Sequence, residues 1–318
     1  MRASRVAVVA APRRIDVATR SFDDPAPGRV RVAIAGCGVC GSNLPVWEGR
    51  PWFGYPLSPG APGHEAWGRV EAVGDGVTTC AVGDPVAFLG EDAFAEHIDV
   101  PAEHVVVLPA QLADAPFPGE ALGCGFNIAA RSGFAEGQTV AVVGLGFLGG
   151  VVTAIAAQAG ARVVAVSRRP FSLDIGTAMG AKETIPLDVD VAQRVGELTG
   201  GDMCDVVVEA VGSQAALDLA GNLGGVRSRL VIAGFHQDGQ RTVDVQGWNW
   251  RGIDVVNAHE RHDDVRLRGI REAADAVAAG WFDPSPLYTH TVPLERLGDG
   301  LDGMVDRPDG FLKALMVL

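Results

Sequence analysis

TVAVVGLGFLGGVVTAIAAQAGARVVAVSRR, residues 139–169, is the stretch that decides how this chain folds. It begins with an apolar, β-branched run (139–143) and continues at once into the glycine-rich turn GLGFLG (144–149). A segment of small residues with helical spacing follows, ends at Gly160, and leads into a second apolar run (162–166). These features predict a strand–turn–helix–strand unit of about 30 residues, which is the size of one βαβ unit.

The glycines of this turn have separate tasks in such a unit. Gly144 allows the tight turn, Gly146 lets a pyrophosphate approach the backbone, and Gly149 lets the helix pack on the strand. The helix N-terminus then offers unpaired N–H groups and a positive dipole end to phosphate. We therefore predict dinucleotide binding at this turn, Phe147 and Leu148 included. A purely structural glycine turn is the alternative.

The residues after the second strand favour NADP(H). An NAD-binding unit usually carries Asp or Glu about 20 residues beyond the glycines, where it bonds the ribose 2′-hydroxyl. This chain has Ser167, Arg168 and Arg169 there, and no carboxylate. A hydroxyl and guanidinium groups can bind a 2′-phosphate through charge-assisted hydrogen bonds, whereas a carboxylate would repel it. The alternative is that both arginines are solvated loop residues.

The composition is that of a globular protein with an acidic charge balance. The chain has 318 residues, 47% of them hydrophobic and 20% charged, which suits one large or two ordinary domains. Its formal net charge of −13 argues against nucleic acid or an anionic membrane as a main partner, because both bind basic faces. We expect no transmembrane helix, because no apolar run reaches about 20 residues. The five irregularly spaced cysteines and the absence of a signal-peptide pattern lead us to expect a cytoplasmic protein without a disulfide framework.

Two patterns divide the chain into a β-rich region and an α/β region. The first region has short alternating runs separated by Gly, Pro and Asp turns, which predicts an all-β domain. From residue 134 to about 259, apolar runs alternate with helical segments, which predicts a doubly wound parallel sheet. Its expected strands are 139–143, 162–166, 183–185, 205–209, 229–233 and 253–258. We expect the C-terminal residues to return to the first domain, so the predicted domains are 1–121 with 262–318, and 122–261.

Several side chains of the types that bind zinc lie in the first region and at its end. They are Cys37, Cys40, His64, Glu65, Glu120 and Cys124. Three protein ligands with one open position would make a catalytic rather than a structural zinc site. The alternative is that the cysteines are small buried hydrophobic residues.

A resemblance to a known family strengthens the zinc hypothesis. Five motifs carry it, in this order: GCGVCGSNL (36–44), PGHEAWGRVEAVGDGV (62–77), VGDPVAF (82–88), GEALGCGFNIAARSG (119–133) and VVGLGFLG (142–149). Together they resemble the zinc-containing medium-chain dehydrogenase/reductase superfamily, most closely its polyol (sorbitol-type) and threonine dehydrogenase branch. The resemblance covers essentially the whole chain and implies a GroES-like β domain with a Rossmann domain.

The resemblance also implies site residues. Cys40 and His64 match two zinc ligands of the family, with Glu65 as an additional candidate ligand and Cys37 as a neighbour. Glu120 and Cys124 both compete for the third position. Gly144 follows Glu120 by 24 residues and Cys124 by 20. The longer spacing matches the sorbitol-type pattern without gaps, so we assign Glu120 as the third ligand.

Further positions concern the cofactor and the proton path. Val211 and Gly234 are further candidate cofactor-binding residues. The family usually has Asp where this chain has Asn43, and alcohol dehydrogenases have a relay histidine where it has Pro45. Proton exit is therefore expected through Ser42 and water. The four-cysteine structural-zinc lobe is missing, so we expect one catalytic zinc and no structural zinc.

These expectations define a function and its alternatives. Zinc would act as a Lewis acid on an alcohol or carbonyl oxygen, and NADP(H) would exchange a hydride with the substrate. Cys40, Ser42, His64 and Glu65 would form the catalytic set, acting on a small-molecule alcohol, polyol or carbonyl substrate. We expect a homodimer or homotetramer formed through the edge strand 253–258. The alternatives are a metal-free quinone or enoyl reductase of the same superfamily, and a non-catalytic NADPH-binding protein.

Overall fold

The computed structural model describes residues 2–318, which form two compact units. The first unit comprises residues 2–123, His262–Gly280 and Tyr288–Leu318, and the second comprises Cys124–Arg261 and Trp281–Leu287. From the sequence we expected residues 281–287 in the first domain.

Ring packing explains why this short segment belongs to the second unit instead. The ring centroids of Trp281 and Phe282 each lie 5.9 Å from that of Phe126. The Leu287 side chain packs at Gly150, where an added Cβ would lie 2.6 Å from it. Aromatic and aliphatic burial therefore decides where this segment packs.

The second unit contains a six-stranded parallel sheet with the order β10-β9-β8-β11-β12-β13. Its strands are β8 (Thr139–Val143), β9 (Arg162–Ser167), β10 (Glu183–Pro186), β11 (Cys204–Glu209), β12 (Gly224–Ile232) and β13 (Asp254–Asn257). Its helices are α3 (Phe147–Gln158), α4 (Pro170–Ala178), α5 (Val191–Thr199), α6 (Gln214–Leu223) and α7 (Val245–Arg251); α2 (Gly119–Ser132) begins in the first unit and continues in the second. In order of appearance the strands run 3-2-1-4-5-6, the dinucleotide-binding order. The predicted doubly wound α/β sheet is confirmed.

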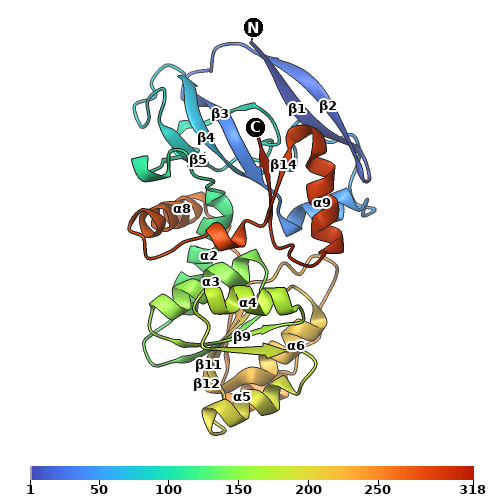
Figure 1. Ribbon diagram of the computed structural model, residues 1–318, viewed down its shortest axis with the longest axis vertical. Coiled ribbons are helices and arrows are strands. Elements are labelled where there is room, and N and C mark those ends of the chain that lie inside the picture. The colour runs from blue at the N-terminus through green and yellow to red at the C-terminus, as the bar shows by residue number, and fades with distance from the viewer. Residues whose placement is uncertain (1) are drawn as a thin grey trace. The chain divides into compact units, whose positions relative to one another are not determined.

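Alternating burial explains the continuous apolar runs of these strands. Val140 and Val142 pack on one face of the sheet with α3, whereas Ala141 and Val143 pack on the other with α5 and α6. A parallel sheet covered on both faces therefore needs apolar residues at every position. Each fully buried valine contributes about 1.5–3 kcal/mol to folding. Figure 1 shows the helices of this unit around its strands.

The first unit is built on a seven-stranded sheet. Six strands follow the order β14-β15-β3-β4-β5-β7, while β6 pairs with β3, and β1 and β2 form a separate antiparallel pair. The strands are β1 (Arg2–Ala11), β2 (Arg14–Phe22), β3 (Arg29–Gly38), β4 (Glu65–Val73), β5 (Pro85–Phe88), β6 (His97–Pro101), β7 (Val105–Val107), β14 (His290–Pro293) and β15 (Ala314–Val317). The α-helices are α1 (Leu44–Trp47), α8 (Asp263–Ala278) and α9 (Leu297–Asp306), and short 3-10 turns include η1 (Gly41–Asn43). The predicted β-rich architecture of the first domain is confirmed.

Two strand pairings in this unit position the candidate metal ligands. β3 pairs antiparallel with β4, with Gly38 opposite Glu65, and the C-terminal strand β15 pairs with the other edge of β3, with Met316 opposite Cys37. The last strand of the chain therefore lies beside the segment that leads into the cysteine motif. Valine, phenylalanine and leucine side chains from β3, β4, β5 and α9 form the core of this unit.

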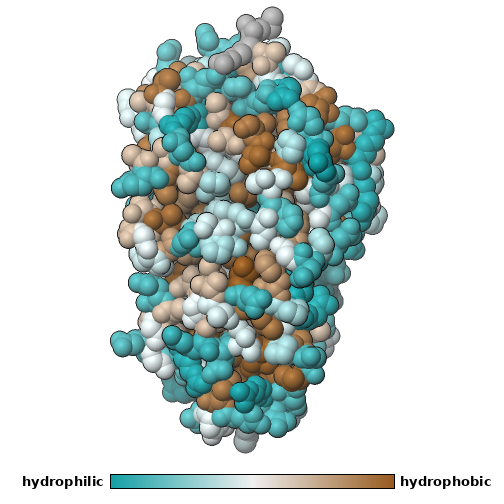
Figure 2. All heavy atoms as spheres, in the orientation of Figure 1, coloured by the Kyte–Doolittle hydropathy of each residue, from teal (hydrophilic) through white to brown (hydrophobic). Residues whose placement is uncertain are grey.

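The surface carries both hydrophobic and hydrophilic side chains. Figure 2 shows patches of hydrophobic residues between hydrophilic ones on the face drawn. Among the large exposed apolar residues are Trp250 and Val245 of α7 and Val255 of the edge strand β13, which are 90%, 64% and 41% exposed. Within residues 2–318, no helix has both the length and the apolar character needed to cross a membrane.

The glycine turn offers a matched pair of substitutions. A Cβ at Gly149 would lie 2.0 Å from the backbone oxygen of Gly144, whereas a Cβ at Gly146 would meet nothing within 4 Å. We expect Gly149→Ala to lower the free energy of unfolding by about 1–3 kcal/mol, because the helix must move away from the strand. Gly146→Ala should change it by less than about 0.5 kcal/mol. Urea unfolding measures both, and equal stabilities of the two variants would contradict the packing argument.

Candidate metal centre and cofactor turn

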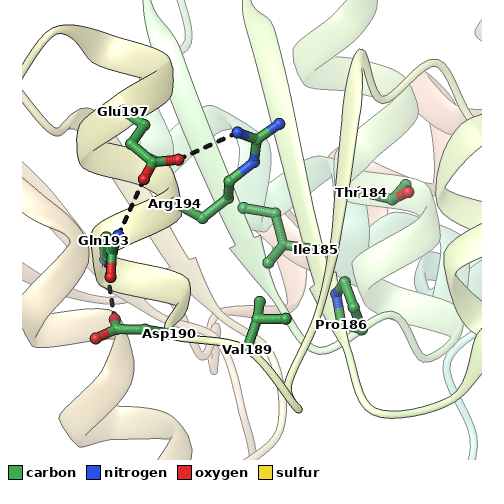
Figure 3. Close-up of a pocket in the computed structure, with 8 residues that line it drawn as sticks. All are labelled: Thr184, Ile185, Pro186, Val189, Asp190, Gln193, Arg194 and Glu197. Atoms are coloured by element: carbon green, nitrogen blue, oxygen red, sulfur yellow. Dashed lines mark hydrogen bonds and ion pairs between the residues drawn. The ribbon is translucent and has the colours of Figure 1, made fainter.

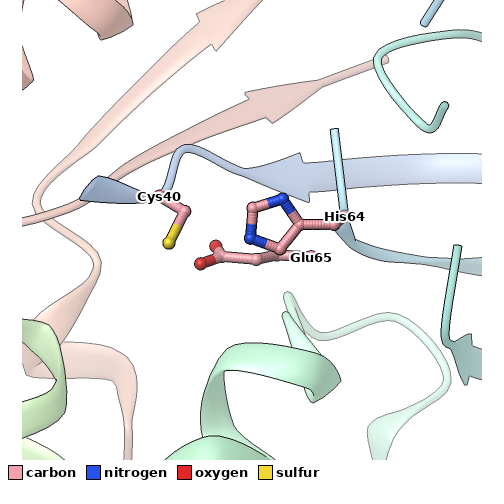
Figure 4. A group of neighbouring side chains, drawn as sticks. All are labelled: Cys40, His64 and Glu65. Carbon is pink, nitrogen blue, oxygen red and sulfur yellow. The ribbon is translucent and has the colours of Figure 1, made fainter. Parts of the chain in front are cut away.

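Cys40, His64 and Glu65 form one cluster in the first unit. One donor atom of each lies within 4.8 Å of the others, and Figure 4 shows the three side chains directed toward one another. The cluster follows from the register of β3 and β4, because Gly38 faces Glu65 and the chain continues directly into Cys40 on one side and His64 on the other. Sulfur, imidazole nitrogen and carboxylate oxygen are the donors that zinc accepts, so the residues fit this metal.

A backbone carbonyl orients the imidazole. The Nδ1 atom of His64 lies 2.8 Å from the carbonyl oxygen of Pro62. Because a carbonyl can only accept, Nδ1 carries the proton in this bond, and Nε2 remains available for a metal. The other side of the cluster is in contact with Ser42, whose Oγ lies 3.5 Å from that Nε2 atom.

Asn43 ties the two ligand-bearing loops together. Its Oδ1 accepts the backbone N–H of Cys40 at 2.9 Å, and its Nδ2 donates to the Pro62 carbonyl at 3.1 Å. A carboxylate at this position could accept the first bond but could not donate the second. The amide is therefore suited to a site in which the peptide carbonyl, rather than a charged side chain, holds His64.

Lys313 is a partner that the sequence analysis missed. Its ammonium donates to Oε2 of Glu65, and both side chains are almost fully buried. Burial lowers the pKa of Lys313, but the charges of Glu65 and Cys40 outweigh this effect and leave the pKa raised. A lone lysine within the apolar C-terminal stretch FLKALMVL (311–318) was the available signal, since a buried lysine requires a partner.

Glu120 occupies a different position from Glu65. It lies in the first turn of α2, and its Oε1 pairs with Nη2 of Arg266 on α8 at 3.2 Å. Within the described residues, the 4.8 Å cluster includes Glu65 but not Glu120. Glu120 nevertheless acts on the cluster electrostatically, because its charge contributes to the raised pKa of His64.

The pKa values of His64 and Cys37 are shifted for different reasons. Burial lowers the pKa of His64, but hydrogen bonding to Cys40 and the nearby negative charges raise it to about 10. A metal must therefore displace a proton from this pair when it binds. Burial raises the pKa of the Cys37 thiol, which suits an inert core residue. All five cysteines are free of disulfide bonds, and Cys124 is the first residue of the second unit.

Three loops of the second unit converge at the carboxyl ends of neighbouring strands. Gly144 has φ of 99°, and a Cβ there would lie 2.4 Å from Cγ2 of Val211. A Cβ at Gly234 would lie 2.2 Å from the backbone nitrogen of Gly212. The predicted cofactor residues Gly144, Val211 and Gly234 therefore lie on adjoining loops after β8, β11 and β12. The backbone at Gly146 is open to an approaching phosphate.

The residues expected at the ribose lie at the end of β9. Ser167 is its last residue and is 8% exposed, and its Oγ accepts the backbone N–H of Arg169 at 3.4 Å. Arg169 is the N-cap of α4, and Arg168 between them is exposed. Phe147 and Leu148 open helix α3 directly after the glycine turn, where Phe147 is 9% exposed.

A separate hollow of about 330 Å³ lies beside β10 and α5 (Figure 3). Its polar side chains bind one another: Asp190 accepts the N–H of Gln193, and Glu197 accepts from Gln193 and Arg194. None of its lining residues belongs to the metal cluster or to the cofactor loops. We therefore assign it no part in the chemistry.

Comparisons with known proteins define the class. Two family models match the chain, one described as an alcohol dehydrogenase GroES-like domain over residues 26–110 and one as a zinc-binding dehydrogenase over residues 148–267. The chain is 31% identical to 5-exo-hydroxycamphor dehydrogenase of Pseudomonas putida, over 74% of this chain and 77% of that protein. It is 26% identical to sorbitol dehydrogenase of Bacillus subtilis, over 98% and 96%.

A solved structure has the same fold. A protein of Sinorhizobium meliloti, described as a zinc-binding dehydrogenase and bound to NADP, shares the fold with a TM-score of 0.88 at 22% identity over 100% of both chains. The chain therefore belongs to the alcohol dehydrogenase-like, medium-chain dehydrogenase/reductase family.

The buried ion pair of Lys313 and Glu65 should contribute to the stability of the protein. Lys313→Met should lower the free energy of unfolding by about 3–5 kcal/mol, because the carboxylate of Glu65 loses its cation inside the protein. Adding Glu65→Gln should recover much of this loss, since the buried negative charge is then gone. Urea unfolding in the presence of a chelator measures both variants. Equal stability of Lys313→Met and the double variant Lys313→Met/Glu65→Gln would show that the unpaired carboxylate of Glu65 is not the cause of the loss.

Proposed function

We propose that this protein is a zinc-dependent oxidoreductase that transfers a hydride between NADP(H) and an alcohol or polyol, or the corresponding carbonyl compound. The main support is the cluster of Cys40, His64 and Glu65, whose imidazole is oriented by the Pro62 carbonyl so that Nε2 is available to a metal. The glycine turn at the strand ends supports the cofactor, and the matches to sorbitol and threonine dehydrogenases support the substrate class.

The proposed ligands are Cys40, His64 and Glu120, with Glu65 as the neighbouring carboxylate. Glu65 neutralises the buried ammonium of Lys313, whereas the Arg266 that pairs with Glu120 is 30% exposed. Bound zinc supplies a Lewis acid that lowers the pKa of an alcohol hydroxyl.

The chain's own residues complete the proposed chemistry. The Ser42 hydroxyl, 3.5 Å from Nε2 of His64, is suited to pass the substrate's proton to water, since Pro45 has no titratable side chain. The glycine turn binds the pyrophosphate, while Ser167, Arg168 and Arg169 receive the 2′-phosphate. Two alternatives remain distinct: a metal-free reductase would need no zinc, and a non-catalytic NADPH-binding protein would transfer no hydride to any carbonyl substrate.

Metal analysis tests the ligand assignment. We expect one zinc per chain, and Ala at Cys40, His64 or Glu120 should abolish metal binding and activity while NADPH still binds. Cys124→Ala is the matched control and should retain the metal. Elemental analysis of each purified variant measures this. Loss of zinc in Cys124→Ala together with its retention in Glu120→Ala would reverse the assignment.

Cofactor titration tests the preference for NADPH. We expect NADPH to bind about ten- to a hundredfold more tightly than NADH at fixed ionic strength, because the end of β9 offers a hydroxyl and guanidinium groups. The double variant Ser167→Asp/Arg168→Ala should reverse the order, because the carboxylate repels the phosphate and accepts the free 2′-hydroxyl. Equal or tighter NADH binding by the unmodified protein would refute the preference.

The edge strand supports a homodimer or homotetramer. β13 ends the parallel sheet, and its unpaired backbone groups lie next to exposed Val255. We expect a mass of at least twice 33.1 kDa by light scattering at micromolar concentration. Val255→Lys should shift the population toward monomer, because a charge on an edge strand opposes pairing. A monomeric mass for the unmodified protein would count against this assembly.

A further inference from the structure

Glu209 is a completely buried carboxylate that has no part in the chemistry described above. It is the last residue of β11, and its side chain is 0% exposed. Its Oε1 accepts the backbone N–H groups of Val211 at 2.8 Å and Gly212 at 2.7 Å. Its Oε2 lies 2.9 Å from Nε2 of His236, which is on the loop after β12. The carboxylate therefore joins the loops that follow two neighbouring strands.

The hydrogen bonds around His236 determine which of its nitrogens carries the proton. Nε–H of Arg241 donates to Nδ1 of His236 at 2.9 Å. A guanidinium group has no acceptor, so Nδ1 must use its lone pair in this bond. The proton of the neutral ring is then on Nε2, where it is donated to Glu209. With both nitrogens engaged in this way, His236 has no free lone pair with which to act as a general base.

Arg241 binds both His236 and the loop that carries Gly212. Its Nη2 donates to the carbonyl oxygen of Gly212 at 3.0 Å and pairs with the carboxylate of Asp238. Gly212 thus donates its N–H to Glu209 and accepts a bond from Arg241. The chain Glu209–His236–Arg241 therefore binds both backbone groups of this residue.

Close backbone contact shows that the two loops tolerate little displacement. A Cβ at Gly234 would lie 2.2 Å from the nitrogen of Gly212 and 2.6 Å from Oε2 of Glu209. Gly212 itself has φ of 86°, and a Cβ there would lie 2.5 Å from the carbonyl oxygen of Phe235. Val211, which precedes Gly212, is packed against the glycine turn at Gly144.

The sheet order indicates which half of the cofactor these loops receive. β9, which ends at the proposed 2′-phosphate site, lies on one side of β8, whereas β11 and β12 lie on the other. A dinucleotide that crosses the end of β8 with its adenosine over β9 places its nicotinamide half over β11 and β12. The loops joined by Glu209 and His236 are therefore those that meet the nicotinamide half.

We infer that His236, held in its Nε2-protonated form between Glu209 and Arg241, is a positioning residue that locks the loops of Val211 and Gly234 in the arrangement that binds the nicotinamide half of the cofactor. This inference rests on the proposed function, because it presupposes that the second unit binds a dinucleotide.

Substitution of His236 tests the inference through cofactor affinity, followed by the fluorescence of NADPH on titration. His236→Ala should weaken binding about tenfold, because Glu209 and Arg241 each lose the hydrogen bond to His236 that connects them. His236→Gln should bind within about threefold of the unmodified protein, because a glutamine amide can donate to Glu209 and accept from Arg241. Gln237→Ala, an exposed neighbour on the same loop, is the control and should bind within about twofold.

The outcomes separate this inference from the proposed function. If the unmodified protein binds neither NADPH nor NADH, the proposed function fails. If it binds a cofactor and His236→Ala binds equally well, or His236→Gln is as weak as His236→Ala, the positioning role is overturned.

A second measurement needs no variant. Nitrogen-15 NMR of the unmodified protein should show the His236 ring protonated at Nε2 and unprotonated at Nδ1 at pH 7. A ring that carries its proton at Nδ1, or at both nitrogens, would overturn the inference even if the alanine variant failed to fold.

Discussion

The buried ion pair between Lys313 and Glu65 is the interaction on which the candidate metal centre depends. Two charges removed from water are costly unless they meet each other in good geometry. Here the C-terminal strand β15 brings the ammonium to a carboxylate that begins β4, and β3 lies between these two strands. Gly38 makes the contact feasible, since a Cβ there would lie 1.9 Å from Oε2 of Glu65. The end of the chain is thus part of the site rather than a covering strand.

Around this pair, neutral groups orient the candidate ligands, although charged groups could also do so. The peptide carbonyl of Pro62 orients His64, and the amide of Asn43 holds that same carbonyl and the backbone of Cys40. Cys40 and the carboxylates of Glu65 and Glu120 are the acidic groups that act on His64. Each carboxylate has a cation of its own, Lys313 for Glu65 and Arg266 for Glu120. Lys313 is buried, whereas Arg266 is partly exposed. Glu120 can therefore leave its cation to turn toward a metal at a lower cost than Glu65.

In the second unit, too, a buried carboxylate holds neighbouring segments of the chain in place. The cofactor loops of this unit have to approach one another closely, and glycines at 144, 212 and 234 remove the side chains that would prevent this. Close approach alone does not hold loops in place, because glycine is also the most flexible residue. The buried carboxylate of Glu209 compensates for that freedom by binding two backbone N–H groups and one imidazole.

Local patterns in the sequence were enough to predict the parallel sheet, the glycine turn and the β-rich first region. Apolar periodicity and turn residues act over a few positions, so the printed sequence records them directly. The resemblance added the GroES-like architecture and the assignment of Cys40 and His64 as ligands, and the motifs of these two residues are also local. The boundary of the second unit was wrong at residues 281–287, because ring packing on Phe126 has no local signature.

Partners far apart in the chain were decided only by the tertiary structure. Lys313 is 248 residues from Glu65, Arg266 is 146 residues from Glu120, and His236 is 27 residues from Glu209. Which strands become neighbours, and in which register, determines these contacts, and no single segment encodes that choice. The sequence by itself therefore determined the kinds of chemical group available to this protein, whereas strand pairing decided which of them compensate one another, because a buried charge is stable only beside the partner that folding brings to it.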